Sequence, residues 1–255
     1  DQGRVLKFEP HGSYLTASAN TVIQGLTIQN GYLNSYEAKG AGIYIDNASP
    51  SFTNCIIKSN YLRNYNGDGY AKVFGAGVYA NNSSSVFTNV IVDENESNTE
   101  TGHYDNDALS WGGGFYIEGN STDFFIIDSQ IKNNRVHARD NNGDGRSVAQ
   151  PYGAGIYKTS NGTLTIQNTD IVNNNISSEG NQRDERTGGI EMHGGVLNIA
   201  NCTIANNQKQ GVYRHGGEIN ISSSIIWDND NNDAGSITYS YTNRQGGAPG
   251  GEGNI

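Results

Sequence analysis

The sequence predicts an all-β protein in which short parallel strands stack in a repeating coil. The prediction depends on a repeated block of five residues, a nearly constant distance from each block to a following Asn, and the absence of helical periodicity. Gly (34) and Asn (35) supply 69 of the 255 residues, and hydrophobic residues supply only 34%. Low hydrophobicity can indicate disorder, but 15 Tyr and recurrent Val and Ile clusters favour a folded chain.

The repeated block has the form Gly-x-Gly-aliphatic-Tyr. Its full copies lie at residues 40–44, 75–79, 112–116 and 153–157, and degenerate copies lie at 187–191 and 209–213. From the start of each block to an Asn that follows an aliphatic residue by three positions, the distance is 20 to 22 residues. From that Asn to the next block, it varies from 2 to 19 residues. A constant core therefore alternates with one variable insertion.

Each core is too short to bury an interior alone, but stacked cores hydrogen-bond to one another at about 4.8 Å. In such a stack the aliphatic position of the block faces inward and the following Tyr faces outward. Glu191 interrupts this outward row before Tyr213. The recurring Asn is expected to form an internal ladder in which each side-chain amide bonds to the next. The ladder residues are Asn60, Asn95, Asn134, Asn174, Asn207 and Asn229.

The phrases Gly-x-Gly-Ile-Tyr-Ile and Cys/Thr-x-Ile-x-x-Asn resemble the repeats of the right-handed parallel β-helix family, a pectate-lyase-like superfold, over residues 4–243. The resemblance implies a single-stranded right-handed parallel β-helix solenoid of about seven rungs, with long insertions at one corner. We expect one domain over residues 1–255, with repeats at 4–243 and a Gly-rich tail at 246–255. The fold hosts lyases, hydrolases, adhesins and structural fibres, so it does not identify an activity.

The charge restricts the partners. The net charge is −10 and the pI is about 4.8. Phosphate backbones are bound by clustered Lys and Arg, so we expect no nucleic-acid partner. No apolar run approaches the roughly 18 residues that span a bilayer, and we therefore expect no membrane insertion.

Five insertions leave the stack at the same corner, at residues 32–39, 61–74, 96–111, 135–152 and 175–186. They are rich in aromatic residues and lie beside the outward Tyr row. Two interpretations stay open: a surface that binds a glycan or a protein partner, or rings that only pack the long loops together. The candidate ligand-binding residues are Tyr44, Tyr79, Tyr116, Tyr157 and Trp111.

Oxygen-rich segments within the insertions predict bound Ca²⁺. Their spacing is that of the first half of an EF-hand loop, with side-chain oxygens at positions 1, 3 and 5 and Gly at position 6. Position 12 is Pro151 or Gly75 instead of the bidentate Glu, so neighbouring rungs would have to complete any site. Asn-Gly-Asp-Gly is also an ordinary turn sequence. The candidate ligands are Asp140, Asn142, Asp144, Asn64, Asn66, Asp68, Asp105 and Asp107.

No catalytic residue is identified. The resemblance implies an Arg or Lys base beside Ca²⁺ for a lyase, and clustered carboxylates with Gly-His-Gly for a hydrolase. The Arg residues of the insertions form no lyase signature. His193 and His215 lack the preceding Gly and the paired Asp. The two His residues lie at nearly the same position of consecutive repeats, which allows their side chains to stack. We interpret such a pair mainly as a solvated feature of the strands.

The leading hypothesis is a secreted or cell-surface structural subunit, stabilised by Ca²⁺ and forming extracellular fibres or an adhesive stalk. Open strand edges at both ends suggest either end-to-end self-association or capping by neighbouring domains of a longer chain. Two alternatives remain: a polysaccharide lyase or glycoside hydrolase acting at the insertion corner, and a non-catalytic glycan-binding module. The missing catalytic motifs and the Asp- and Asn-rich insertions favour the structural role.

Overall fold

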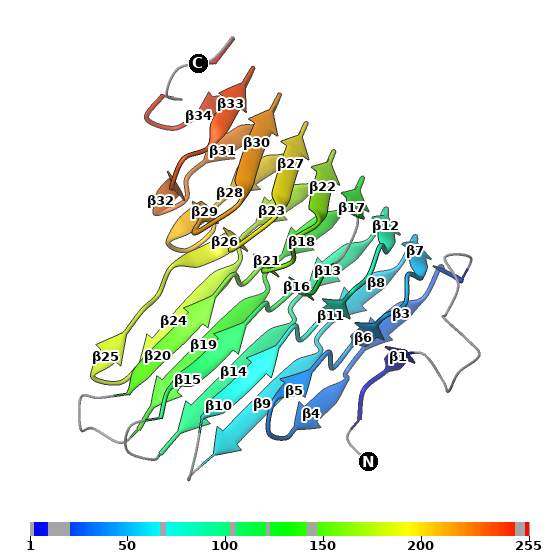
Figure 1. The fold of residues 1–255 in the computed structure, drawn as a ribbon, viewed down its shortest axis with the longest axis vertical. Helices are drawn as coiled ribbons and strands as arrows, with labels where there is room; N and C mark the ends of the chain where they lie inside the picture. The colour runs from blue at the N-terminus through cyan, green and yellow to red at the C-terminus, as the bar shows by residue number, and fades with distance from the viewer. Residues whose placement is uncertain are drawn as a thin grey trace.

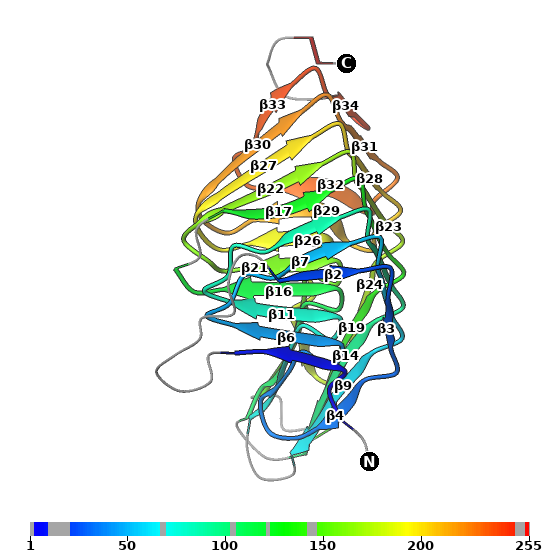
Figure 2. The same cartoon turned by 90° about the vertical axis from the view of Figure 1, so that its right-hand side faces the viewer.

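The computed structural model describes residues 3–9, 21–66, 70–102, 106–120, 123–141, 147–247 and 253–254. Their strands pair in parallel and form three sheets of eight strands and two sheets of five strands. The three larger sheets are the walls of a coil that the chain climbs from one end to the other (Figures 1 and 2). The fold is the single-stranded parallel β-helix that the sequence predicts.

The three walls together are here called the body. The first wall contains β1 (Leu6–Phe8), β6 (Ile43–Asp46), β11 (Val78–Asn81), β16 (Phe115–Glu118), β21 (Ile156–Lys158), β26 (Thr187–Met192), β29 (Gln210–Arg214) and β32 (Asn231–Ala234). The second wall contains β2 (Val22–Gln24), β7 (Ser51–Thr53), β12 (Val86–Thr88), β17 (Phe124–Ile127), β22 (Thr163–Gln167), β27 (Val196–Ala200), β30 (Glu218–Ser222) and β33 (Thr238–Ser240). The third wall contains β3 (Thr27–Gln29), β8 (Ile56–Lys58), β13 (Ile91–Asp93), β18 (Gln130–Lys132), β23 (Asp170–Val172), β28 (Thr203–Ala205), β31 (Ile225–Trp227) and β34 (Asn243–Arg244).

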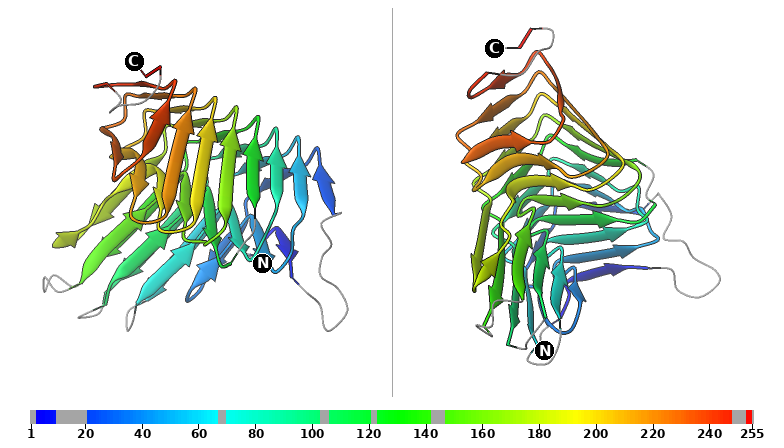
Figure 3. Two further views of the ribbon diagram at one scale, coloured as in Figure 1. Left: turned by 45° about the horizontal axis from the view of Figure 1, so that its top comes forward. Right: turned by 60° about the vertical axis from the view of Figure 1, so that its left-hand side comes forward.

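The two five-stranded sheets project from the corner between the third and first walls and are here called the wing (Figure 3). In each of five rungs, one strand leads out and the next leads back. The outgoing sheet contains β4 (Tyr32–Asn34), β9 (Tyr61–Asn66), β14 (Glu96–Thr101), β19 (Arg135–Asp140) and β24 (Asn175–Glu179). The returning sheet contains β5 (Ala38–Lys39), β10 (Ala71–Phe74), β15 (Ala108–Trp111), β20 (Val148–Tyr152) and β25 (Gln182–Arg183).

The insertions therefore leave at one corner, as expected, but they are strands rather than crowded loops. Each insertion continues the hydrogen bonding of the rung below it; for example, all six residues of β14 are in register with β9 on one side and β19 on the other. Each wall holds eight strands, against the expected number of about seven rungs. The six blocks supply six strands of each wall, and the leading and trailing repeats supply one each.

The core of the body consists of the inward positions that the repeat predicts. The aliphatic positions of the blocks are fully buried, at Ile43, Val78, Phe115, Ile156, Ile190 and Val212. Cys55 and Cys202 are free and buried in the same core. The wing has separate, smaller clusters that are rich in Ala, which lets its two sheets lie close together.

The second Gly of each block allows the backbone of the next rung to approach closely. A Cβ on Gly77 would lie 2.7 Å from the carbonyl oxygen of Gly114. The equivalent contact at Gly42 would be 2.6 Å, to the carbonyl oxygen of Gly77 itself. A side chain at this position would force two hydrogen-bonded rungs apart.

We expect Gly77→Ala to lower the free energy of unfolding by about 1–3 kcal/mol, the usual cost of overpacking. Gly194→Ala is the matched control, because its Cβ would meet nothing closer than 3.6 Å. Urea denaturation followed by circular dichroism measures both variants. Equal stability of the two would contradict the proposed close approach of the rungs.

Candidate functional site

The six ladder asparagines form one continuous column inside the body. From Asn60 to Asn207, each Nδ2 donates to the Oδ1 of the next Asn, at distances of 2.9 to 3.0 Å. The same Nδ2 also donates to a backbone carbonyl of the preceding rung, as Asn134 does to Val92 at 3.0 Å. Both side-chain N–H bonds are thereby used at a buried site. The column stabilises the turn and offers no free group to a ligand.

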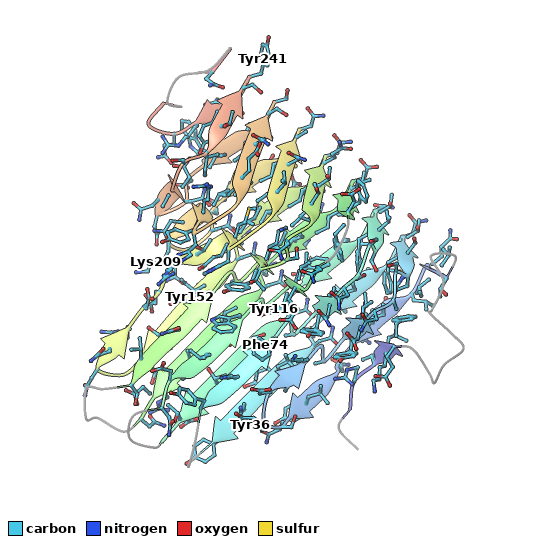
Figure 4. All side chains as sticks on the ribbon, in the orientation of Figure 1. Tyr36, Phe74, Tyr116, Tyr152, Lys209 and Tyr241 are labelled. Atoms are coloured by element: carbon cyan, nitrogen blue, oxygen red, sulfur yellow. The ribbon has the colours of Figure 1, made fainter. Side chains whose placement is uncertain are left out.

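The outward Tyr row is covered by the wing. Tyr79, Tyr116 and Tyr157 are only 2%, 4% and 6% exposed, because Phe74, Trp111 and Tyr152 of the returning sheet pack over them. The row stacks in nearly parallel fashion, with ring centroids 5.7 Å apart for Tyr79 and Tyr116 and 5.3 Å apart for Tyr116 and Tyr157. These rings, together with the half-buried Tyr44, are here called the aromatic zipper; Phe74, Tyr116 and Tyr152 mark it in Figure 4.

The zipper favours the second of the two open interpretations, in which the rings pack the insertions against the body. The Tyr rings point away from the body, as predicted, but they form an interface between two sheets rather than an accessible surface. Trp111 joins the same interface, with its ring centroid 5.5 Å from that of Tyr157. Ligand binding by Tyr79, Tyr116 and Tyr157 would require the wing to separate from the first wall.

Cations flank both ends of the zipper. The Arg4 guanidinium lies 4.5 Å from the Tyr44 ring centroid, and Lys39 lies 4.8 Å from that of Tyr79. At the other end, the Arg186 guanidinium lies 4.6 Å from the centroid of Tyr152. A cation over a ring face is attracted by the negative face of the π system.

A polar cluster replaces the zipper in the last rung of the wing. Glu191 occupies the Tyr position in register with Tyr157 and Tyr213, and its side chain is fully buried. Its Oε1 lies 2.8 Å from His193 Nε2 and 3.9 Å from the Arg186 guanidinium. In the sequence, Glu in place of Tyr indicates only an interruption of the row. The expected His193–His215 stack is present, with ring centroids 4.6 Å apart.

The Glu191 carboxyl is placed at an energetic cost. Burial raises its pKa above the ordinary glutamate value, while His193 and Arg186 oppose this shift by favouring the charged form. A carboxyl whose folded-state pKa is raised binds protons more tightly in the folded state. Its contribution to stability is therefore present at low pH and is lost as the pH rises through the folded-state pKa.

We expect Glu191→Gln to remove this pH dependence. The wild type should lose stability relative to the variant as the pH rises from the ordinary glutamate pKa through the raised folded-state pKa, because only the wild type must ionise a buried carboxyl. Melting temperatures of both proteins across that range provide the measurement. Glu94→Gln, which changes an exposed carboxyl, is the control. A constant difference between wild type and Glu191→Gln would contradict the shift.

Lys158 is a second buried ionisable group that sequence reasoning missed. It fills an inward position of the first wall, and its Nζ donates to the carbonyl oxygens of Ser160 (2.7 Å) and Gly194 (2.6 Å). Burial lowers its pKa to about 8. The side chain closes a corner between the first and second walls. The sequence does contain a signal for this buried Lys. Lys158 occupies the position at which the neighbouring rungs have Ile117 and Met192.

Three predicted calcium ligands have described side chains, Asp140, Asn64 and Asp107, and they lie at or near the outer edge of the wing, called here the wing tips. Asp140 ends β19, is only 4% exposed, and is in register with Thr101 and, beyond it, Asn66. Asn64 belongs to a different row, in register with Thr99 and Ala138, so the structure does not place it beside Asp140. Asp107 Oδ1 accepts a hydrogen bond from the Val148 N–H at 2.8 Å. The other predicted ligands, Asp68, Asp105, Asn142 and Asp144, and the side chain of Asn66 lie outside the described part of the structure.

Among the described residues, no group of three His, Cys, Asp or Glu side chains gathers closely enough to hold a metal ion. No helix in the same part of the chain has the length and hydropathy of a membrane span. Comparisons with protein-family models, with curated proteins and with solved structures found no match to this chain.

Proposed function

We propose that the protein is a structural β-helix module, secreted or at the cell surface, whose wing tips are held together by Ca²⁺. The observation that supports this most is the shared register of body and wing. The same rungs that align the ladder also align the strand ends of β9, β14 and β19. Asn66, Thr101 and Asp140 lie in one row across these strands, so a cation beside that row would contact more than one rung.

The described candidate ligands carry the kind of oxygen donor that a calcium ion uses. Asp140 brings a carboxylate to the wing tip, and Asp107 has one oxygen bound to Val148 N–H, which fixes the orientation of its carboxylate. Ca²⁺ accepts carboxylate, amide and carbonyl oxygens in flexible geometry, and these are the donors that Asn- and Asp-rich segments carry. When bound, the ion would neutralise the carboxylates of an acidic chain and link successive rungs.

The expected affinity for Ca²⁺ favours an extracellular location. Without a bidentate Glu at position 12, each site has few strong ligands, and we expect dissociation constants of about 10⁻⁴–10⁻³ M, as in extracellular calcium modules. Sites of that strength are filled at extracellular calcium concentrations. A rigid body whose polar groups are used in ladders suits a load-bearing role there.

Ca²⁺ should raise the melting temperature of metal-free protein, and chelation with EDTA should lower it, because an ion that binds only the folded state stabilises it. We expect Asp140→Asn to weaken Ca²⁺ uptake in isothermal titration. Asp123→Asn is the control, because Asp123 is exposed and precedes β17 on the second wall, away from the wing. No uptake by wild type at millimolar Ca²⁺, or equal uptake by Asp140→Asn, would refute the proposed sites.

A further inference from the structure

The structure contains an open hollow of about 490 Å³ that lies outside the zipper and the wing tips and borders the ladder at Asn174 and Asn207. The residues that line it are Asn173, Asn174, Asn175, Asn206, Asn207, Gln208, Asp228 and Asp230. Its volume falls within the range of small-molecule sites, about 300–1,000 Å³. Its lining, however, is entirely amide and carboxylate side chains.

The hollow exists because the wing ends with β24 and β25 while the body continues. After β24, the chain crosses the same corner through short connections, Asn206–Gln208 in one rung and Asp228–Asp230 in the next. The last outgoing strand therefore stands beside two rungs that have no insertion, which leaves a ledge. The sequence signal for it is the spacing of only two residues between Asn207 and the block that begins at Lys209.

The open edge of β24 above this ledge is closed by its own neighbours. Gln208 Oε1 accepts the Ile176 N–H at 3.2 Å, and Glu185 Oε1 accepts the Ser178 N–H at 2.8 Å. These side chains take the positions that a further strand would occupy. The edge is thereby blocked against strand addition, and the hollow beside it stays open to a small ligand.

The outer amides of the hollow are available for a ligand. Elsewhere the exposed turn residues bond along the stack; Asn133, for instance, donates to Asp93 at 2.8 Å. In the rungs beside the hollow, Asn173, Asn175 and Asn206 are exposed, and their side chains make no hydrogen bond with the described residues. An amide both donates and accepts, which matches the hydroxyl groups of a sugar.

An exposed aromatic residue, Trp227, lies next to two lining residues of the hollow through its backbone. Trp227 directly precedes Asp228, and its carbonyl accepts the Asn206 N–H at 3.3 Å. The side chain is 46% exposed on the outer face of the third wall, beside the small residue Ala205 of the neighbouring strand. Unlike Trp111, which packs within the zipper, Trp227 has no stacking partner among the described residues. A Trp that borders polar amides offers a flat apolar surface next to hydrogen-bonding groups.

We propose that this ledge binds a neutral saccharide, with one sugar face against Trp227 and its hydroxyl groups bonded to Asn206, Asn173 and Asp228. Two carboxylates in the lining and the net charge of −10 disfavour an acidic sugar. Lys209 does not compensate, because its ammonium group is paired with Glu185 at 3.1 Å. The site is separate from the proposed calcium sites, and its test is independent of them.

The two Trp residues of the chain provide the readout. Neutral hexasaccharides (cellohexaose, laminarihexaose, mannohexaose and maltohexaose) are titrated into the protein with EDTA present, and Trp fluorescence is recorded with excitation at the red edge. We expect a saturable change with at least one of them. Trp227→Phe should abolish the fluorescence change, because only Trp111 remains. Calorimetry of the same variant should show that binding is retained.

Trp227→Ala should weaken binding at least tenfold, and Asn206→Ala should weaken it several-fold. Ile225→Ala is the matched control, because Ile225 is equally exposed on the same strand, at 46%, and its affinity should equal that of wild type. Circular dichroism establishes that each variant is folded. The proposal is overturned if no neutral probe binds at about 10 mM, far above the range of useful affinities, or if Trp227→Ala binds as wild type does. Tighter binding of hexagalacturonate or of a chitosan hexamer would overturn the neutral class.

Discussion

Asn134→Leu is expected to lower the free energy of unfolding by about 3 kcal/mol or more, at about 1–3 kcal/mol for each buried polar group left unpaired. Asn134 Oδ1 accepts from both the backbone N–H and the Nδ2 of Asn95, at 3.1 and 2.9 Å. Its Nδ2 donates to Val92 O and to Asn174 Oδ1, both at 3.0 Å. Leu is of similar size but satisfies none of these groups.

Urea denaturation of Asn134→Leu provides the measurement. The control is Asn175→Leu, which makes the same chemical change at an exposed strand position and should alter stability by less than about 0.5 kcal/mol. If both variants unfold at the same urea concentration as wild type, the column does not stabilise the fold as its geometry indicates.

Tyr116→Ala is expected to cost about 3–5 kcal/mol, the usual range for truncating a buried aromatic side chain. The ring lies at the centre of the zipper, within 5.1 Å of Phe74, 5.3 Å of Tyr157 and 5.7 Å of Tyr79, measured between ring centroids. Its loss leaves a cavity between the wing and the first wall. Near-ultraviolet circular dichroism should report the disordered packing of the remaining rings.

Tyr116→Phe separates packing from hydrogen bonding. It keeps the ring and removes only the hydroxyl, which donates to Glu118 Oε2 at 3.1 Å. The cost should therefore be about 1 kcal/mol. A Tyr116→Ala variant as stable as Tyr116→Phe would mean that the zipper does not hold the wing to the body.

The body of the fold could be predicted from the sequence because its determinants are periodic. The positions of Ile43 and Asn60 recur at nearly fixed spacing in six repeats, and their burial follows directly from stacking. The direction of the Tyr row also followed from the repeat. Its burial did not, because the strands that cover it belong to segments of unequal length and composition.

The wing strands illustrate what a pattern of hydrophobicity cannot reveal. The segment Glu96–Thr101 contains no hydrophobic residue, yet it forms β14 and buries Ser97, Thr99 and Thr101. It is a strand because β9 and β19 present backbone groups on both sides. The ledge is difficult to predict for a different reason. It forms where an insertion is missing between Asn207 and Lys209, so no residue of the sequence marks it directly.

The asparagine column has a direction. In every step from Asn60 to Asn229, the amide nitrogen faces the following rung and the oxygen faces the preceding one. The amide dipoles therefore add head to tail, and each hydrogen bond polarises its neighbours. The backbone bonds of the parallel sheets run both ways between rungs and largely cancel. The solenoid thus has an electrical axis along its length, with its positive pole at the Asn229 end, and the two ends of the body differ in potential even where their surfaces carry the same charges.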